Sequence, residues 1–354
     1  MLTSLIKPVR LKKGDTLAAV TLSWGGPAAF PHRYQAGKRQ LEEAFGVQVV
    51  EMPHTLSSAE FLAVDPRARA DDLMQAFVDP GIDGIVSTIG GEDSIRLIPY
   101  IDLDVIRNNP KVFLGFSDTT VSHFLCLRAG LRSFYGPSIM AGFGENGGLF
   151  PFMADAVRQV LFSTDPIGAL RPNTDGWTSE LLDWADPSLQ TQKRALQPAT
   201  GWRFLQGAGV HYGHLIGGCV EVLDWLRGTP VWPDITVWRD AVLFLETSEE
   251  APSPQAVRRI LRTLQAVGTL KEISAILIGR PGGEIDPAQF VEYDKMVLDV
   301  IRNEVGRPEL PIVTNMDFGH TDPMFVFPYG ARCEIDCDRE SIHIPESGVS
   351  GRRG

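Results

Sequence analysis

The chain has 354 residues, of which 44% are hydrophobic, and this length and composition indicate folded cores and favour two domains. The formal net charge of −11 argues against nucleic acid as a partner, because phosphate binding needs clustered Lys and Arg. The sequence holds no apolar run long enough to cross a bilayer, and its N-terminal segment lacks the apolar stretch of a signal peptide. We therefore expect a cytoplasmic protein that does not contact membranes.

The N-terminal part of the chain alternates apolar runs with amphipathic helical patterns. The predicted strands are residues 16–24, 47–52, 84–90 and 111–116, and the predicted helices are 34–45, 68–79 and 120–130. Strands that are apolar throughout and separated by helices are typical of a parallel sheet that is covered on both faces. The sequence thus predicts an α/β domain over residues 1–170, with an open, mainly parallel sheet and helices on both faces.

Residues 165–208 interrupt this alternation with a stretch rich in Pro, Asp, Thr and Gln. The segment includes Trp177, Trp184 and Trp202. It is too long for an ordinary connection, which favours a functional loop or a linker. We place the domain boundary within it and treat residues 171–208 as a connecting loop or lid.

A second α/β pattern follows this segment. The predicted strands are residues 241–247, 273–281, 310–317 and 331–337, and the predicted helices are 253–267 and 287–303. The first of these helices has a typical start, with Ser253 as N-cap and Pro254 in the first turn. We expect a C-terminal α/β domain over residues 209–354, with a mixed or barrel-like sheet.

The four cysteines give no sign of a metal site. Cys126 and Cys219 are isolated, and the spacing of Cys333 and Cys337 is not that of a zinc ribbon. A G-x-G-x-x-G dinucleotide fingerprint is absent as well. We expect four reduced thiols, no metal and no cofactor.

The stretch FLGFSDTT, residues 113–120, places Ser117 between a predicted strand and a predicted helix. Ligands bind at the carboxyl edge of open α/β sheets, and the N-terminus of a helix suits a developing negative charge. These features suit Ser117 as a nucleophile, although the stretch is not the G-x-S-x-G elbow. From these residues alone, however, a plain helix cap by Ser117 or Asp118 is the favoured interpretation, and the nucleophile is the alternative.

A nucleophilic serine needs a base and a residue that orients the base. His320 follows the predicted strand 310–317 in a loop, although a loop histidine is also ordinary surface chemistry. Glu246 ends an apolar strand and is the favoured acid, while Asp317 competes for that role. The turn STIGGEDS, residues 87–94, contains Gly90 and Gly91. These glycines either allow a tight turn or point backbone N–H groups into a cleft.

Six stretches together resemble the LD-carboxypeptidase family of serine peptidases, and most closely its microcin C immunity-type branch. They run in the family's order from residue 87 to 324: STIGGEDSIRLIPYIDLD, FLGFSDTT, FYGPS, GHLIGGCVEVLDWLRGT, LFLETSEEAPSP and NMDFGHTDPM. The resemblance implies a catalytic triad at the interface of two domains. It assigns Ser117 as nucleophile, His320 as general base and then acid, Glu246 as the residue that orients His320, and the N–H groups of Gly91 and Asp118 as an oxyanion hole.

The resemblance also implies a substrate class and a homodimer, but it leaves the branch open. One branch removes the terminal D-Ala of a muramoyl tetrapeptide and usually has Arg-Gly-Gly-Tyr-Gly at the glycine turn. The immunity branch cleaves the amide between a peptide's aspartate and a modified adenylate, and STIGGEDS is nearer to it. We expect a small peptide or peptidyl-nucleotide substrate.

The immunity branch stacks loop tryptophans on the base, which implies Trp177 and Trp184 as substrate-binding residues. We expect Gly90 of the glycine turn to contact the substrate as well, because paired glycines let the backbone approach it closely. Tryptophans in a lid can equally serve as apolar cover. Cys219 stands where many members have Asn after Gly-Gly, so the specificity can differ. A non-catalytic binding protein on the same scaffold is the alternative from another class.

Overall fold

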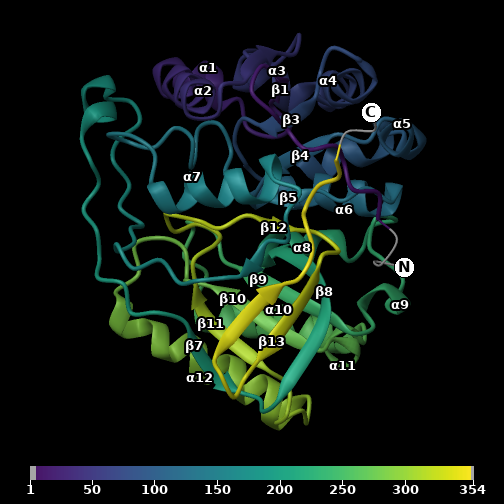
Figure 1. The fold of residues 1–354 in the computed structure, drawn as a ribbon, viewed down its shortest axis with the longest axis vertical. Coiled ribbons are helices and arrows are strands. Elements are labelled where there is room, and N and C mark those ends of the chain that lie inside the picture. The colour runs from purple at the N-terminus through teal and green to yellow at the C-terminus, as the bar shows by residue number, and fades with distance from the viewer. Residues whose placement is uncertain (1–4, 352–354) are drawn as a thin grey trace.

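The computed structural model of the protein describes residues 5–351, which form two sheets with helices around them (Figure 1). The first sheet has six strands in the order β12-β5-β4-β3-β1-β2. All neighbours in it are parallel except β12, which runs antiparallel to β5. The strands are β1 (Thr16–Val20), β2 (Gln48–Glu51), β3 (Gly84–Ser87), β4 (Val112–Gly115), β5 (Phe134–Tyr135) and β12 (Phe327–Pro328).

Helices alternate with these strands, as the sequence predicts. They begin and end where the local residues favour it. For example, Asp65 accepts a hydrogen bond from the N–H of Ala68 at the start of α4, and Gly46 ends α2 in the left-handed region. The helical segments are α1 (Gly26–Ala29), α2 (Pro31–Phe45), α3 (Ala59–Val64), α4 (Pro66–Val78), η2 (Ser94–Tyr100), α5 (Leu103–Asn108), η3 (Ser117–Thr119), α6 (Thr120–Ala129), α7 (Pro151–Val157) and η4 (Arg158–Phe162).

The second sheet is mixed and has eight strands in the order β6-β14-β13-β8-β9-β10-β11-β7. Strands β8 to β11 are parallel, and antiparallel strands flank them on both sides. The strands are β6 (Gly168–Ala169), β7 (Arg203–Gln206), β8 (Val210–Cys219), β9 (Ala241–Glu246), β10 (Ala275–Gly279), β11 (Ile312–Met316), β13 (Arg332–Asp336) and β14 (Ser341–Ile344).

The helical segments of this half include α10, which starts as the sequence predicts, with the Ser253 side chain accepting a hydrogen bond from the N–H of Ala256. The segments are η5 (Pro187–Thr191), α8 (Val220–Leu226), α9 (Ile235–Trp238), α10 (Pro254–Ala266), α11 (Thr269–Glu272), η6 (Pro287–Gln289), α12 (Phe290–Leu298) and η7 (Asp299–Glu304). The two-sheet α/β fold expected from the sequence is confirmed. The boundaries at residues 170 and 208 stay predictions.

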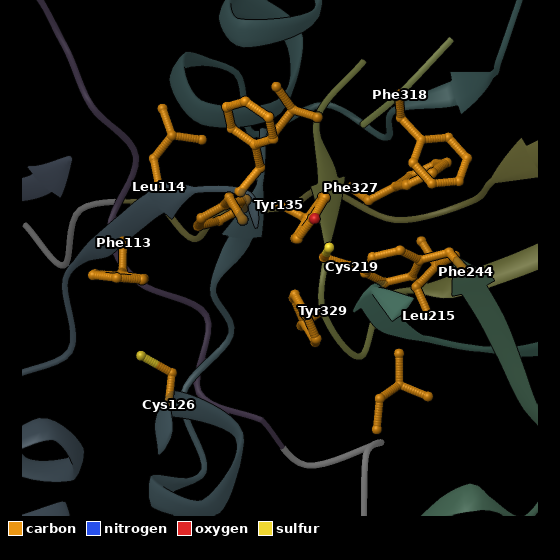
Figure 2. Packing of buried hydrophobic residues seen from close by; sticks show 14 of the residues in the cluster. Phe113, Leu114, Cys126, Tyr135, Leu215, Cys219, Phe244, Phe318, Phe327 and Tyr329 are labelled. Carbon is orange, nitrogen blue, oxygen red and sulfur yellow. The ribbon is translucent and has the colours of Figure 1, made fainter. Parts of the chain in front are cut away.

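The two sheets share one core, because short strands cross between the halves of the sequence. β12 joins the first sheet, and β6 joins the second. Figure 2 shows Tyr135 of β5 beside aromatic residues of the C-terminal half. The ring centroid of Phe244 lies 5.4 Å from that of Tyr135, 5.4 Å from that of Phe327 and 5.2 Å from that of Tyr329. Such aromatic packing holds β5 of the first sheet against β9 of the second.

Between residues 5 and 351, no helix combines the length and the apolar character that crossing a membrane requires.

Candidate active site

Ser117 lies at the tip of a sharp turn between β4 and α6. Its φ of 61° is in the left-handed region, which is strained for a residue with a side chain. The starts of η3 and α6 have no side-chain cap hydrogen bond. The Ser117 hydroxyl instead faces His320, with its Oγ 3.0 Å from Nε2. The backbone strain thus presents this hydroxyl to the histidine and does not serve a helix cap.

Glu246 is the partner of His320 on the other side of the imidazole ring. It ends β9, is 0% exposed, and its Oε2 lies 2.6 Å from His320 Nδ1. The close approach depends on Gly319, whose φ is 92°. A Cβ on Gly319 would lie only 2.6 Å from the Cβ of Glu246. The structure therefore brings the three residues singled out in the sequence into one hydrogen-bonded chain.

Asp317, the competing acid, has other partners. Its carboxylate forms a buried ion pair with Arg280 and accepts hydrogen bonds from Trp202 Nε1 at 2.8 Å and from the backbone N–H of Asn173 at 3.0 Å. These contacts tie the segment 171–208 to the end of β11. Asp317 is thus a structural residue beside the site, and of the two acids considered for the triad it is Glu246 that contacts the imidazole.

Two carboxylates set the charge of His320. Burial by itself would lower the pKa of the imidazole, but Glu246 and then Glu249 outweigh it and raise the pKa well above its usual value. Glu249 lies in the loop after β9, and its Oε2 is 3.1 Å from His320 Nε2. The same nitrogen therefore faces both the Ser117 hydroxyl and a carboxylate. The sequence did not single out Glu249.

Tyr135 is a second residue that the sequence analysis missed. Its hydroxyl donates a hydrogen bond to Glu246 and accepts one from the backbone N–H of Ser117 at 3.1 Å. Burial, followed by the charge of Glu246, raises the pKa of Tyr135 well above its usual value, which keeps the hydroxyl proton in place. The stretch FYGPS was the only signal for it, and a pattern cannot reveal this tertiary contact.

The glycine turn packs directly against the nucleophile. A Cβ at Gly90 would lie 2.7 Å from Ser117 Oγ and 3.4 Å from the backbone N of Asp118. Gly91 has a φ of 141°, and a Cβ there would lie 2.4 Å from Ser23 Oγ. Only glycine fits at either position. Because these two residues have no side chain, the turn can pack directly against Ser117.

The side chain of Asp118 holds the same turn in place by hydrogen bonds to its backbone. The carboxylate is buried and accepts hydrogen bonds from the N–H groups of Asp93 at 3.0 Å and Ser94 at 2.8 Å. The Ser94 hydroxyl in turn donates to the carbonyl oxygen of Asp118 at 2.8 Å. The role of the Gly91 and Asp118 N–H groups as an oxyanion hole stays a prediction, but the residues that carry them are held at the nucleophile.

A cavity of about 490 Å³ opens onto this site. Ser117, Gly90, His320, Trp184 and Arg33 are among its lining residues. The Arg33 guanidinium lies 4.1 Å from the centre of a Trp184 ring, a cation–π contact. Burial lowers the pKa of Arg33 to about 10, so the group stays cationic at neutral pH. The cavity thus combines an aromatic face and a positive charge beside the nucleophile.

Trp177 lies elsewhere. It is 3% exposed and packs with its ring centroid 5.6 Å from that of Phe290, while Arg280 lies 5.1 Å from its ring. It does not line the cavity at Ser117. Of the two tryptophans predicted to bind substrate, only Trp184 lines the cavity that opens onto Ser117.

Between residues 5 and 351, no cluster of three or more His, Cys, Asp and Glu side chains is arranged to hold a metal ion. The four cysteines are free thiols.

The chain is similar to known proteins over most of its length. The N-terminal domain of the LD-carboxypeptidase family matches residues 17–136, and the C-terminal domain matches residues 212–335. A carboxypeptidase homologue of Vibrio cholerae is 31% identical over 97% of this chain and 98% of its own. The Escherichia coli microcin C7 self-immunity protein MccF is 26% identical, with 96% of each chain covered.

Two solved structures are similar over nearly the whole chain. An MccF-like protein from Streptococcus pneumoniae, in complex with AMP, has a TM-score of 0.84 and 32% identity, covering 93% of this chain and 98% of its own. MccF in complex with aspartyl sulfamoyl adenosine has a TM-score of 0.79 and 26% identity, covering 98% and 100%. Two matched family domains, a full-length relative and the same fold lead to one conclusion: the chain belongs to the LD-carboxypeptidase family.

Proposed function

We propose that the protein is a serine hydrolase that cleaves a small peptide-like amide through an acyl-enzyme. One observation carries the proposal: His320 lies between Ser117 and Glu246, with 3.0 Å from Nε2 to the hydroxyl and 2.6 Å from Nδ1 to the carboxylate. These are the distances that proton transfer from a nucleophile to an oriented base requires. Membership in a peptidase family supports the same conclusion.

The proposed reaction has two halves. His320 takes the Ser117 proton as the hydroxyl oxygen attacks the amide carbon, and the carbonyl oxygen becomes an oxyanion facing the N–H groups of Gly91 and Asp118. The C–N bond then breaks, and His320 gives the proton to the leaving nitrogen. In the second half, His320 activates a water molecule that hydrolyses the ester and returns the proton to Ser117. Glu246 stabilises the imidazolium in both halves.

For the substrate we propose an aminoacyl or peptidyl nucleotide, as in the microcin immunity branch. The cavity at Ser117 supports this, because Trp184 offers a stacking surface and Arg33 a cation for an anionic linker. The S. pneumoniae relative was solved with AMP, and MccF with aspartyl sulfamoyl adenosine. The alternative is a muramoyl tetrapeptide, since a murein peptide carboxypeptidase homologue of Bacillus subtilis is 26% identical over 97% of this chain. A homodimer and a cytoplasmic location stay predictions.

The test compares hydrolysis of an aminoacyl sulfamoyl adenosine and of a muramoyl tetrapeptide, with the released sulfamoyl adenosine or D-Ala measured by chromatography. We expect the first to be cleaved at least about tenfold more efficiently, and Ser117→Ala to abolish cleavage while ligand binding persists. Ser163→Ala is the matched control, since Ser163 contacts only Asp165 at the surface. Near wild-type hydrolysis by Ser117→Ala would refute the mechanism, and binding without cleavage by the wild type would favour a non-catalytic protein.

A further inference from the structure

A second cavity, of about 840 Å³, also opens onto Ser117. It shares Trp24, Gly91, Ser117 and Glu249 with the cavity that contains Trp184, so the two meet at the proposed nucleophile. An enzyme that attacks an amide must hold a group on each side of the scissile bond. Two cavities that meet at one hydroxyl provide these two places. The further inference concerns the half of the substrate that the second cavity receives, and it rests on the function proposed above.

The charged residues that line the second cavity are mostly acidic, namely Glu92, Asp93, Glu221, Glu249 and Glu250. One arginine, Arg96, lines it, and it is paired with Asp93 at 3.2 Å. Asp93 also pairs with the buried Arg69 at 2.8 Å. Asp93 is therefore shared by two arginines, and Arg96, whose side chain is 46% exposed, is the one cation among the residues that line this cavity.

The remaining carboxylates of this cavity have no cationic partner within residues 5–351, apart from the contact of Glu249 with His320. The Glu221 carboxylate is held by neutral donors, namely the hydroxyl of Ser248 at 2.7 Å and the thiol of Cys219 at 3.1 Å. Burial raises the pKa of Cys219 well above its usual value, so this side chain stays a neutral thiol. Glu92 and Glu250 line the same cavity. Its wall is thus negative on the side of the loop after β9.

Glu249 connects this negative wall to the reaction. Its side chain is 57% exposed, yet its carboxylate contacts Nε2 of the largely buried His320. The contact suits an imidazolium, which donates its Nε2–H, and opposes the neutral imidazole, which presents a lone pair to Ser117. In this arrangement the base is held in its inactive state. The exposed Glu249 side chain can rotate into the cavity without disturbing the core.

We propose that Glu249 is a specificity determinant that pairs with a cationic group, an ammonium or a guanidinium, on the acyl half of the substrate. The pairing moves Glu249 away from Nε2, so that His320 accepts the Ser117 proton more readily when such a substrate is bound. The contact between Glu249 and His320, and the opening of the acidic cavity onto Ser117, carry this inference. The acyl preference is then opposite to that of an enzyme that accommodates an aspartyl group, since a carboxylate here meets like charges.

The cation can be the α-ammonium or a basic side chain, and acetylation separates the two sources. The probes are lysyl, alanyl and aspartyl sulfamoyl adenosine, together with Nε-acetyl-lysyl and Nα-acetyl-alanyl forms. We expect kcat/KM to fall about tenfold on acetylation of whichever nitrogen pairs with Glu249, and to be lowest for the aspartyl probe. If neither acetylation lowers kcat/KM and the aspartyl probe is preferred, the inference is wrong.

Variants connect this preference to Glu249 itself. In Glu249→Gln, acetylation should no longer lower kcat/KM, and kcat/KM for the aspartyl probe should rise relative to that for the lysyl probe. Glu43→Gln, at an exposed position of α2 away from both cavities, is the matched control and should keep the wild-type preference. A wild-type preference in Glu249→Gln would overturn the assignment.

The failure of this inference can be distinguished from the failure of the proposed function. If hydrolysis depends on Ser117 but ignores acetylation, only the cationic preference is wrong. If no probe is hydrolysed, the affinity of each probe for the Ser117→Ala variant, measured by calorimetry, still tests the cationic preference. Tighter binding of the unacetylated probe, lost in the double variant with Glu249→Gln, supports the inference, and equal binding of all probes overturns it.

Discussion

Tyr135 donates a hydrogen bond to Glu246, and the same hydroxyl accepts the backbone N–H of Ser117 at 3.1 Å. The acid and the nucleophile are therefore connected twice, once through His320 and once through Tyr135. The second connection fixes the strained turn that bears Ser117 relative to the end of β9. Because β5 lies in the first sheet and β9 in the second, it also holds the two sheets in register at the site.

Replacing this tyrosine tests the connection. Tyr135→Phe leaves Ser117 N–H and Glu246 each without one partner, a loss of about 1–3 kcal/mol per buried group. We expect kcat to fall by about tenfold or more with little change in KM, because orientation and not binding is affected. Tyr212→Phe, at an exposed tyrosine, is the control for stability and expression. An unchanged kcat in Tyr135→Phe would show that Glu246 and Ser117 are oriented without it.

The pH dependence of kcat/KM reports the protonation of His320 in the free enzyme. The groups that face the ring are the carboxylates of Glu246 and Glu249, the hydroxyl of Ser117 and the ring of Phe116, at 4.9 Å between centroids. The carboxylates raise the pKa of His320, and only the neutral form can accept a proton. The rate should therefore be full above the raised pKa and fall as the pH decreases through it.

The acid limb should accordingly lie above about pH 6.5, the ordinary value of histidine. Hydrogen bonding to His320 lowers the pKa of Glu249 to about 2, so Glu249 stays ionised across this range. Glu249→Gln removes one of the two negative charges and should shift the limb to lower pH. A wild-type limb at or below pH 6.5, or no shift in the variant, would contradict this account of the site's charge.

Gly319 tests whether Glu246 must approach the loop that carries His320. A Cβ there would lie 2.7 Å from the Glu246 carboxylate, at a backbone φ of 92°. Gly319→Ala should reduce kcat by about 100-fold or more, because a displacement near 1 Å has an effect of that order. Gly201→Ala has a similar φ of 73° with open space, and it separates backbone strain from the steric clash. Equal activity of the two variants would disprove the steric argument.

Trp177 and Trp184, two of the three tryptophans of the segment 171–208, should respond differently to substitution. Trp184→Ala removes a wall of the cavity and should raise KM for an aminoacyl sulfamoyl adenosine about 10- to 100-fold, by the loss of base stacking. Trp177→Ala removes a buried ring and should lower stability by about 3–5 kcal/mol. Steady-state kinetics of both variants measure the change in KM, and thermal unfolding measures the change in stability. A KM effect confined to Trp177→Ala would reverse our assignment.

The sequence predicts the strands on which the site depends, because β4, β9 and β11 are buried and each begins with a run of apolar residues. Ser117, Glu246 and His320 each follow or end one of these strands, where polar residues are noticeable. The long strand β8 was missed, because glycines interrupt its apolar pattern. Those glycines are needed, since a Cβ on Gly217 would lie 1.7 Å from the carbonyl oxygen of Phe244 on β9.

Other features depend on contacts between distant segments and have no local pattern. The two-residue strand β12, for example, is defined by its pairing with β5. Tyr135 and Glu249 look like an ordinary core tyrosine and an ordinary surface glutamate. Their importance follows only from the distance of each to the atoms of Ser117, Glu246 and His320.

The most direct test of the account is to look for the acyl-enzyme. The protein is mixed with an aminoacyl sulfamoyl adenosine, quenched with acid within milliseconds and measured by intact and peptide mass spectrometry. The account predicts a mass increase equal to the acyl group, located on the peptide that contains Ser117 and absent from Ser117→Ala. An acyl group on another residue, or turnover by Ser117→Ala at the wild-type rate, would contradict it.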